Sequence, residues 1–259
     1  MFSIATPISH LFKNDVDALM LAQHSDCLEF RDHSPSFGLE KQKLFHCELQ
    51  PIHALREEDF IYLKKIKDER DSLEMVSFHM ATCFEDPVVS DHVFVSGNNK
   101  YSEEEMFENA SKNFKRIKQI LGPTINIAVE NNNYYNTEAY EFICNPTFIS
   151  RVVRDNDIFL LFDLAHAHVS SYNMNIPYQS YCEELPLDKI IQLHICKSGV
   201  NEKMAYDAHF LPDDDVFSEI EELIGRCRAL KYFTVEYYKE SVLLVDVLMK
   251  LKILLNKYE

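Results

Sequence analysis

The stretch Ile158-Phe159-Leu160-Leu161-Phe162-Asp163-Leu164-Ala165-His166 decides the fold prediction. Five consecutive apolar residues end in an acid, and an imidazole follows three residues later. Such a run is typical of a strand that is buried on both faces, as in a parallel sheet. Asp163 and His166 would then lie at the C-terminal end of this strand, and in α/β barrels that end carries the chemistry.

The same pattern, a strand-like run that ends in an acid or a histidine, recurs along the chain. Six runs show it, the first more weakly than the others, and they end at His46, His79, Glu130, Asp163, His194 and Glu236. A single strand that ends in an acid or a histidine would be ordinary. Because six of them share the pattern, we expect these strand ends to converge on one place.

Strands and helices are predicted to alternate along the chain. Strands are expected at residues 2–8, 27–30, 44–49, 75–78, 125–129, 158–162, 190–193 and 232–235. Helices are expected at residues 14–24, 56–71, 103–121 and 216–230, in segments up to 153, and at 242–255. Residues 31–38 are predicted to form a loop, residues 84–100 an irregular stretch and residues 198–212 a polar crossing. This alternation predicts an α/β fold, a TIM (β/α)8 barrel, with residues 1–259 as a single domain.

Composition excludes some classes of partner. The 42 acidic residues outnumber the 26 lysines and arginines, which gives a net charge of −16. Such a charge disfavours nonspecific attraction to nucleic acid or to an anionic membrane surface. The longest apolar segment, residues 242–255, is interrupted by three charged residues, and the N-terminus does not resemble a signal peptide. Seven scattered cysteines without a Cys-x-x-Cys pair indicate free thiols in a reducing cytoplasm.

Nine side chains are candidate metal ligands, namely five imidazoles and four carboxylates: His46, His79, Glu130, Asp163, His166, His194, Asp207, His209 and Glu236. Catalytic sites use three or four protein ligands for each ion, and a carboxylate can bridge two ions, so nine groups can hold two or three metals. Four crowded carboxylates without cations would repel one another. Ligands of nitrogen and oxygen suit iron, manganese or zinc, and the ligand types do not choose among them.

Two short spacings support one shared pocket, because Asp163-x-x-His166 and Asp207-x-His209 each place two ligand types within a few residues. Four further residues lie close to these ligands in sequence and are candidates for contact with a substrate: Asn132, Tyr134, Cys196 and Lys197. Cys196 would share the strand face of His194 if that strand continued.

The order and spacing of the nine residues resemble the xylose-isomerase-like TIM barrel superfamily. Two branches are similar: the endonuclease IV type of DNA repair enzyme, and the multinuclear non-heme iron-dependent oxidative enzymes that modify peptides, including the methanobactin biosynthesis enzyme. The flanking residues favour the second branch. They are Val76-Ser77-Phe78 before His79, Asn131 after Glu130, and residues 185–193 before His194.

This resemblance implies a distribution of ligands among three irons. His46, His79 and Glu130 would hold the first, and Glu130 would bridge to a second that is also held by Asp163, His194 and Glu236. His166, Asp207 and His209 would hold the third. The chain differs from the family in that members often have Asn where His166 stands, and a run of small residues where Ile195-Cys196-Lys197 follows His194.

The function that the resemblance implies is oxidative, dioxygen-using modification of a cysteine, or another side chain, in a ribosomally made precursor peptide. It also implies a separate recognition protein, which we expect because no part of the chain outside the barrel is predicted to grip a leader peptide. The alternatives are an endonuclease IV-like phosphodiester hydrolase, a sugar isomerase of the same superfamily, and a barrel that sequesters metal or binds peptide without catalysis. The net charge argues against a surface that follows a nucleic acid backbone.

Overall fold

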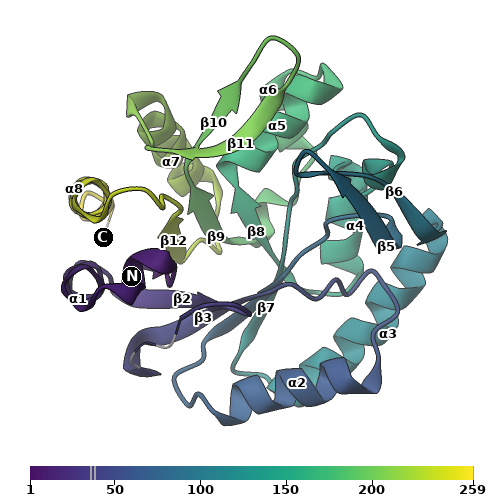
Figure 1. Ribbon diagram of the computed structural model, residues 1–259, viewed down its shortest axis with the longest axis horizontal. Coiled ribbons are helices and arrows are strands. Elements are labelled where there is room, and N and C mark those ends of the chain that lie inside the picture. Colours follow the sequence, from purple (N-terminus) through teal and green to yellow (C-terminus); the bar gives the residue numbers. More distant parts are fainter. Residues whose placement is uncertain (36, 38, 259) are drawn as a thin grey trace.

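Eight parallel strands close into a barrel in the computed structural model, which describes residues 1–35, 37 and 39–258. Each strand pairs with the next along the chain, and β1 closes the ring against β12. The strands are β1 (Ser3–Pro7), β2 (Cys27–Arg31), β3 (Gln42–Cys47), β4 (Met75–Phe78), β7 (Asn126–Glu130), β8 (Phe159–Asp163), β9 (Ile190–Ile195) and β12 (Tyr232–Val235). Figure 1 shows this ring with helices on its outside. The predicted TIM barrel is confirmed.

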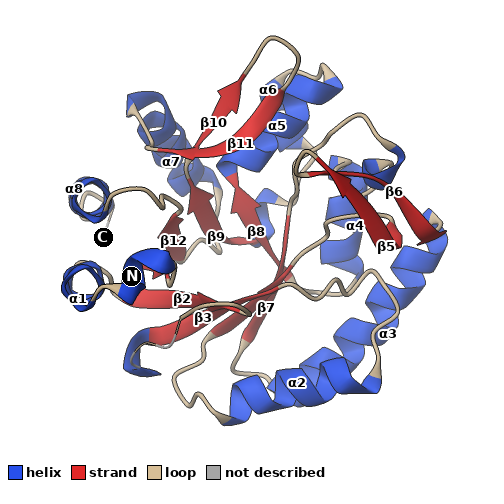
Figure 2. Cartoon of the chain, in the orientation of Figure 1, coloured by secondary structure: helices blue, strands red, loops and turns tan. Residues whose placement is uncertain are grey.

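The helices form the outer layer of the barrel (Figure 2). They are α1 (Asp15–Gln23), α2 (Glu57–Asp68), α3 (Glu103–Leu121), α4 (Pro146–Asp155), α5 (Leu164–Met174), α6 (Tyr178–Glu183), α7 (Asp214–Arg226) and α8 (Ser241–Leu255). Local signals set their ends: Ser102 and Glu105 form a capping box at the N-terminus of α3, and Gly122, with a φ of 80°, ends this helix. Between β2 and β3 the described residues hold only a 3-10 turn, Leu39–Lys41.

The predicted loop at residues 31–38 is wrong at its first residue, because Arg31 is the last residue of β2 and pairs with His46 of β3. This correction matters, since a residue in the strand has a defined inward or outward direction. Ser36 and Gly38 of the predicted loop lie outside the described residues. The third strand begins and ends two residues earlier than predicted.

Two segments that were predicted to be irregular form antiparallel hairpins. They are β5 (Phe84–Ser90) with β6 (Val93–Lys100), and β10 (Lys197–Val200) with β11 (Ala205–Phe210). The first hairpin turns through Asp91 and His92, which have φ values of 49° and 64°. Two central residues with positive φ match the twist of a hairpin, but the turn lacks the Asn-Gly or Asp-Gly pair that would have revealed it.

The inside of the barrel holds a ring of buried side chains with one member from each strand: Ala5, Cys27, Leu44, Met75, Ala128, Leu161, Ile191 and Tyr232. Alternate strand residues, such as Leu160 and Phe162, belong instead to the larger core that the helices cover. Side chains of a strand alternate between its two faces. On β2, β3, β7 and β8 the residue two places beyond the ring therefore points inward again, nearer the C-terminal mouth of the barrel. On β9 the register with β8 shifts, and His194 lies three places beyond Ile191.

The chain offers no described helix that is both long and apolar enough to pass through a membrane. All seven cysteines are buried and free, as expected from their scattered positions.

Candidate metal centre

The barrel brings the nine predicted ligands together at its C-terminal mouth. His46, Glu130, Asp163 and His194 end their strands or lie one residue before the end, and His79 and Glu236 follow β4 and β12 directly. The other three come from elements beyond the strands: His166 from the first turn of α5, and Asp207 and His209 from β11. The hairpin that the sequence did not predict thus supplies two of the nine side chains.

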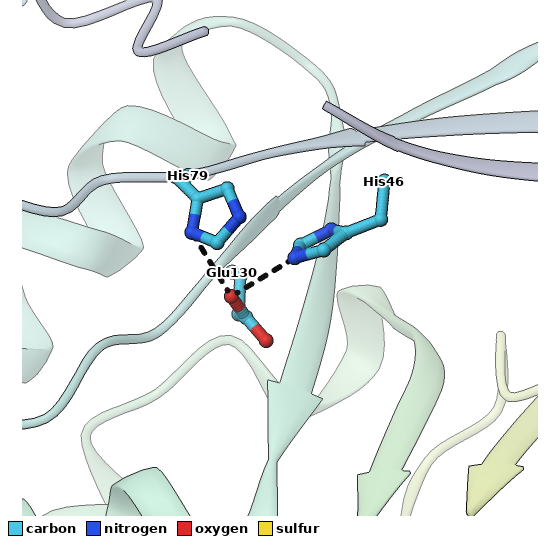
Figure 3. A group of neighbouring side chains, drawn as sticks. All are labelled: His46, His79 and Glu130. Atoms are coloured by element: carbon cyan, nitrogen blue, oxygen red, sulfur yellow. Dashed lines mark ion pairs between the residues drawn. The ribbon is translucent and has the colours of Figure 1, made fainter. Parts of the chain in front are cut away.

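His46, His79 and Glu130 form the first group, which Figure 3 shows. Glu130 Oε2 lies 3.4 Å from His46 Nε2 and 3.5 Å from His79 Nδ1. The two imidazole rings are 4.3 Å apart between centroids. Three donor atoms that face one another in this way match one side of a metal coordination shell.

The second group is centred on His194. Its Nδ1 lies 3.0 Å from Glu130 Oε1, 3.4 Å from Glu236 Oε1 and 3.9 Å from Asp163 Oδ2. Glu130 therefore presents one oxygen to the first group and the other oxygen to His194.

The third group joins α5 to the hairpin. His166 Nε2 lies 3.5 Å from Asp207 Oδ2 and 3.9 Å from Asp163 Oδ2. His209 Nε2 lies 3.2 Å from Asp207 Oδ2 and 3.3 Å from Glu236 Oε2. The φ of His209 is 44°, an uncommon conformation for a non-glycine residue that is concentrated at functional sites.

Three of the histidines are held by a hydrogen bond from one ring nitrogen to a group outside the nine candidate ligands. His46 Nδ1 bonds to Ser77 Oγ at 2.8 Å, His166 Nδ1 to the carbonyl of Asn131 at 2.8 Å, and His194 Nε2 to Glu29 at 2.9 Å. Metal-bound histidines have such outer partners, which fix the ring orientation and the tautomer.

Two buried polar atoms at the centre of the cluster have no hydrogen-bond partner among the described residues: His194 Nδ1 and Asp163 Oδ2. Unpaired buried nitrogen and oxygen atoms are costly, and in native structures each needs an explanation. Both atoms point toward the other candidate ligands. A cation between them would satisfy both, so the donor set fits a bound metal.

The cluster is also electrostatically strained without cations. Burial and the nearby charges of Glu236, Glu130 and Asp207 raise the pKa of Asp163 to about 7, although His166 opposes the rise. Burial would lower the pKa of His166 and of His194, but the surrounding carboxylates raise both well above the usual histidine range. The site thus holds protons in positions where a metal ion would replace them.

Sequence reasoning missed two residues of this site, Glu29 and Arg31, both on β2. Arg31 forms ion pairs with Glu29, at 3.0 Å, and with Glu236. A signal for Glu29 was present: it lies two residues after Cys27, as Asp163 lies two residues after Leu161, and both Cys27 and Leu161 belong to the inner ring. The run before Glu29 was too short and too weakly apolar to mark it.

Comparison with known proteins assigns the family. Residues 52–237 match the family described as RiPP precursor modification enzyme MbnB/TglH/ChrH, in which RiPP denotes a ribosomally made, modified peptide. The chain belongs to this family. The match covers most of the chain and includes eight of the nine candidate ligands; only His46 precedes it.

Curated relatives of this MbnB/TglH/ChrH member include two bacterial proteins named only as UPF0276. One from Caulobacter vibrioides is 25% identical over 101 residues, which cover 39% of this chain and 36% of the relative. One from Acaryochloris marina is 23% identical over 160 residues, covering 58% and 53%. The chain thus spans between about a third and a half of the length of these relatives.

Solved structures share the fold. A xylose isomerase-like TIM barrel protein from Mycobacterium smegmatis in complex with magnesium superposes with a TM-score of 0.63 at 10% identity, covering 99% of this chain and 97% of the other. Endonuclease IV from Thermus thermophilus gives 0.60 at 12% identity, covering 98% and 99%. The fold of this MbnB/TglH/ChrH member is therefore the xylose-isomerase-like TIM barrel.

The four candidate substrate residues lie in different surroundings. Cys196 is buried, and its Sγ lies 3.9 Å from Asp207 Oδ1. Burial and nearby acids raise the pKa of its thiol well above the usual range. Lys197 is bonded to Asp213 and lines a cleft of about 430 Å³ between α5, α6 and α7. Asn132 donates to the carbonyl of Ala81 at 3.0 Å, and the Tyr134 hydroxyl to Asn136 at 3.4 Å.

Proposed function

We propose that this chain is a multinuclear, iron-dependent oxidase that uses dioxygen to modify a cysteine, or another side chain, of a ribosomally made precursor peptide. Membership of a family of RiPP precursor modification enzymes supports the substrate class. The observation that carries the proposal is the position of Glu130, whose two oxygens face histidines of different groups. A carboxylate that bridges two ions has this arrangement.

Two or three iron ions would be held by the three groups as the resemblance implies. His46, His79 and Glu130 would hold the first, Glu130, Asp163, His194 and Glu236 the second, and His166, Asp207 and His209 the third. Zinc or manganese would accept the same nitrogen and oxygen donors, so metal analysis must decide between them. When bound, iron would supply electron transfer with dioxygen and Lewis-acid activation of a substrate thiol.

The exposure of the ligands indicates where a substrate would enter. The side chains of His79 and His209 are each 32% exposed, whereas the other seven candidate ligands are more deeply buried. The ring of Tyr238 lies 5.0 Å from that of His209 and forms part of the same rim. A peptide side chain would therefore approach past His79 and His209, while the buried ligands would be shielded from water.

The proposal is tested by loading the full chain with ferrous iron without oxygen and counting the iron bound per chain. Air and a cysteine-bearing precursor peptide encoded beside the chain are then added, and oxygen uptake and the mass of the peptide are followed. We expect two or three irons, oxygen uptake that depends on the peptide, and a mass change that is lost when the peptide cysteine is replaced by serine. Tightly bound zinc together with cleavage of abasic DNA would overturn the proposal in favour of a hydrolase.

We further infer that a separate protein presents the precursor peptide to the barrel. The family's substrate, a precursor peptide, supports a partner that delivers this peptide to the mouth of the barrel. Fluorescence anisotropy of a labelled precursor tests this, with and without a small companion protein encoded nearby. Tight binding of the peptide by the purified chain without the companion would contradict the inference. We also infer a cytoplasmic site of action, which the seven free thiols favour.

A further inference from the structure

Glu29 is a fully buried carboxylate beside the candidate metal centre, with 0% of its side chain exposed. Its Oε2 accepts a hydrogen bond from Gln192 Nε2 at 2.7 Å and faces His194 Nε2 at 2.9 Å. Its Oε1 accepts bonds from Arg31 Nε at 3.3 Å and Arg31 Nη2 at 3.0 Å. A charge this deeply buried is retained only when its partners compensate for the loss of water.

His194 could bind an ion in either of two ways. Through Nδ1 it would join Glu130, Asp163 and Glu236, with Glu29 on its far side. Through Nε2 it would join Glu29 and Glu236, whose donor atoms also lie close enough together to hold an ion.

The hydrogen bonds favour the first arrangement. Both oxygens of Glu29 are occupied by partners on three side chains, so a direct bond to a metal would break contacts that compensate its buried charge. His194 Nδ1, in contrast, has no hydrogen-bond partner among the described residues, although Glu130 Oε1 lies 3.0 Å away. Nδ1, the ring nitrogen that faces the candidate ligands, is therefore the one that a metal can occupy without breaking the bond to Glu29.

Glu236 is held in a related way at the other end of Arg31. Its Oε1 accepts bonds from Arg31 and from the Tyr238 hydroxyl, the latter at 3.0 Å, while Oε2 faces His209 at 3.3 Å. Arg31 thus contacts the carboxylate behind His194 and one of the candidate ligands at the same time.

We propose that Glu29 is a positioning residue: it holds His194 with Nδ1 toward the metals, and Arg31 ties Glu29 to the ligand Glu236. This inference rests on the metal centre of the proposed function but not on its redox chemistry. An outer partner of this kind typically raises metal affinity about 10- to 100-fold. In this arrangement Glu29 is not a tenth metal ligand. It sets the orientation of the His194 imidazole.

The test compares Glu29→Gln with Glu74→Gln, using Zn²⁺ as a redox-inert probe. Glu74 is a suitable control because it precedes β4, at the opposite end of the barrel, and also bonds to two cationic side chains, those of Lys43 and Lys231. We expect Glu29→Gln to weaken binding of at least one Zn²⁺ about 10- to 100-fold, and Glu74→Gln to leave the affinities unchanged. Circular dichroism confirms that each variant is folded.

A second measurement does not require a variant. Nitrogen-15 NMR of the Zn²⁺-loaded wild-type protein should show His194 bound through Nδ1, with a proton on Nε2. Metal bound through Nε2, or wild-type zinc affinity in folded Glu29→Gln, would overturn the inference. If both results are as expected but no peptide is oxidised, the inference stands and the proposed oxidase activity fails.

Discussion

His194 Nδ1 lies 3.0 Å from Glu130 Oε1, although β8 separates their two strands in the barrel. Both side chains point inward from the ends of parallel strands, so they meet across the barrel mouth rather than along the sheet. The other oxygen of Glu130 faces His46 and His79. This one carboxylate therefore links two groups of candidate ligands.

Because Glu130 links two groups of ligands, replacing it should remove more metal than replacing a ligand that belongs to one group only. We expect Glu130→Ala to lose about two of the bound ions, because a bridging carboxylate serves two metals. His79→Ala should lose only one, since His79 contacts only the first group. The measurement is metal content per chain by mass spectrometry after anaerobic loading. Equal losses in the two variants would show that Glu130 does not bridge.

Metal binding should release protons and strengthen as pH rises. In the metal-free protein, neighbouring carboxylates outweigh burial and raise the pKa of His166 and of His194 above the usual range. Burial and nearby acids raise the pKa of Asp163 to about 7. Below these pKa values protons compete with the metal, so affinity should fall as pH decreases from 8 through about 7 to 6. Titration calorimetry in buffers of different ionisation enthalpy measures the protons released; a result independent of the buffer would contradict this prediction.

Glu74 is expected to contribute to stability without affecting the metals. Burial would raise its pKa, but hydrogen bonds from Lys231, Lys43 and Tyr232 lower it from 4.5 to about 2. A lowered pKa in the folded state gives stability that is present above the unfolded value and lost as pH falls from about 4.5 to 2. Glu74→Gln should therefore reduce the free energy of unfolding near pH 7 by about 1 kcal/mol, with the difference shrinking below pH 4.5. Urea unfolding over this pH range provides the measurement, and a difference that is constant with pH would refute the explanation.

Replacing Cys196 tests whether this residue only packs in the core or also binds a metal ion. Its sulfur could join His209 and Glu236 around an ion, yet burial and nearby acids raise its pKa and favour the neutral thiol in the metal-free protein. We expect Cys196→Ala to keep the full metal content, because the other nine side chains suffice. Stability should fall by about 1 kcal/mol, the usual effect of removing a small buried group. Loss of one ion on mass spectrometry, with the fold retained, would identify Cys196 as a ligand.

The inner ring should stabilise the barrel without acting on the site. Leu161 is fully buried in that ring, two residues before Asp163. We expect Leu161→Ala to reduce the free energy of unfolding by about 2–5 kcal/mol, because it removes buried apolar volume and leaves a cavity. Metal content at 25 °C should remain that of the wild type. Denaturant unfolding and metal analysis check the two halves of this prediction, and metal loss in the folded variant would show that Leu161 also supports Asp163.

Local patterns made much of the fold predictable. The strands Met75–Phe78 and Tyr232–Val235 begin and end where they were predicted, because strands buried on both faces of a parallel sheet are short, mostly apolar runs. The hairpins were missed because neither turn contains an Asn-Gly or Asp-Gly pair. In the first hairpin, Asp91 and His92 adopt positive φ values without such a local signal. Glu29 was missed because the run before it is short.

The sequence by itself determined that strand ends rich in acids and histidines would meet, since parallel strands of one barrel all direct their C-terminal ends to the same mouth. Only the tertiary structure decided which atom faces which: that Glu130 divides its oxygens between two groups, that His194 turns Nδ1 inward while its Nε2 bonds to Glu29, and that Arg31 reaches Glu236. Those relations depend on barrel register, side-chain rotamers and contacts between residues up to 205 positions apart in the chain. Such contacts leave no periodic trace in the order of residues, because each partner follows only its own strand's alternation.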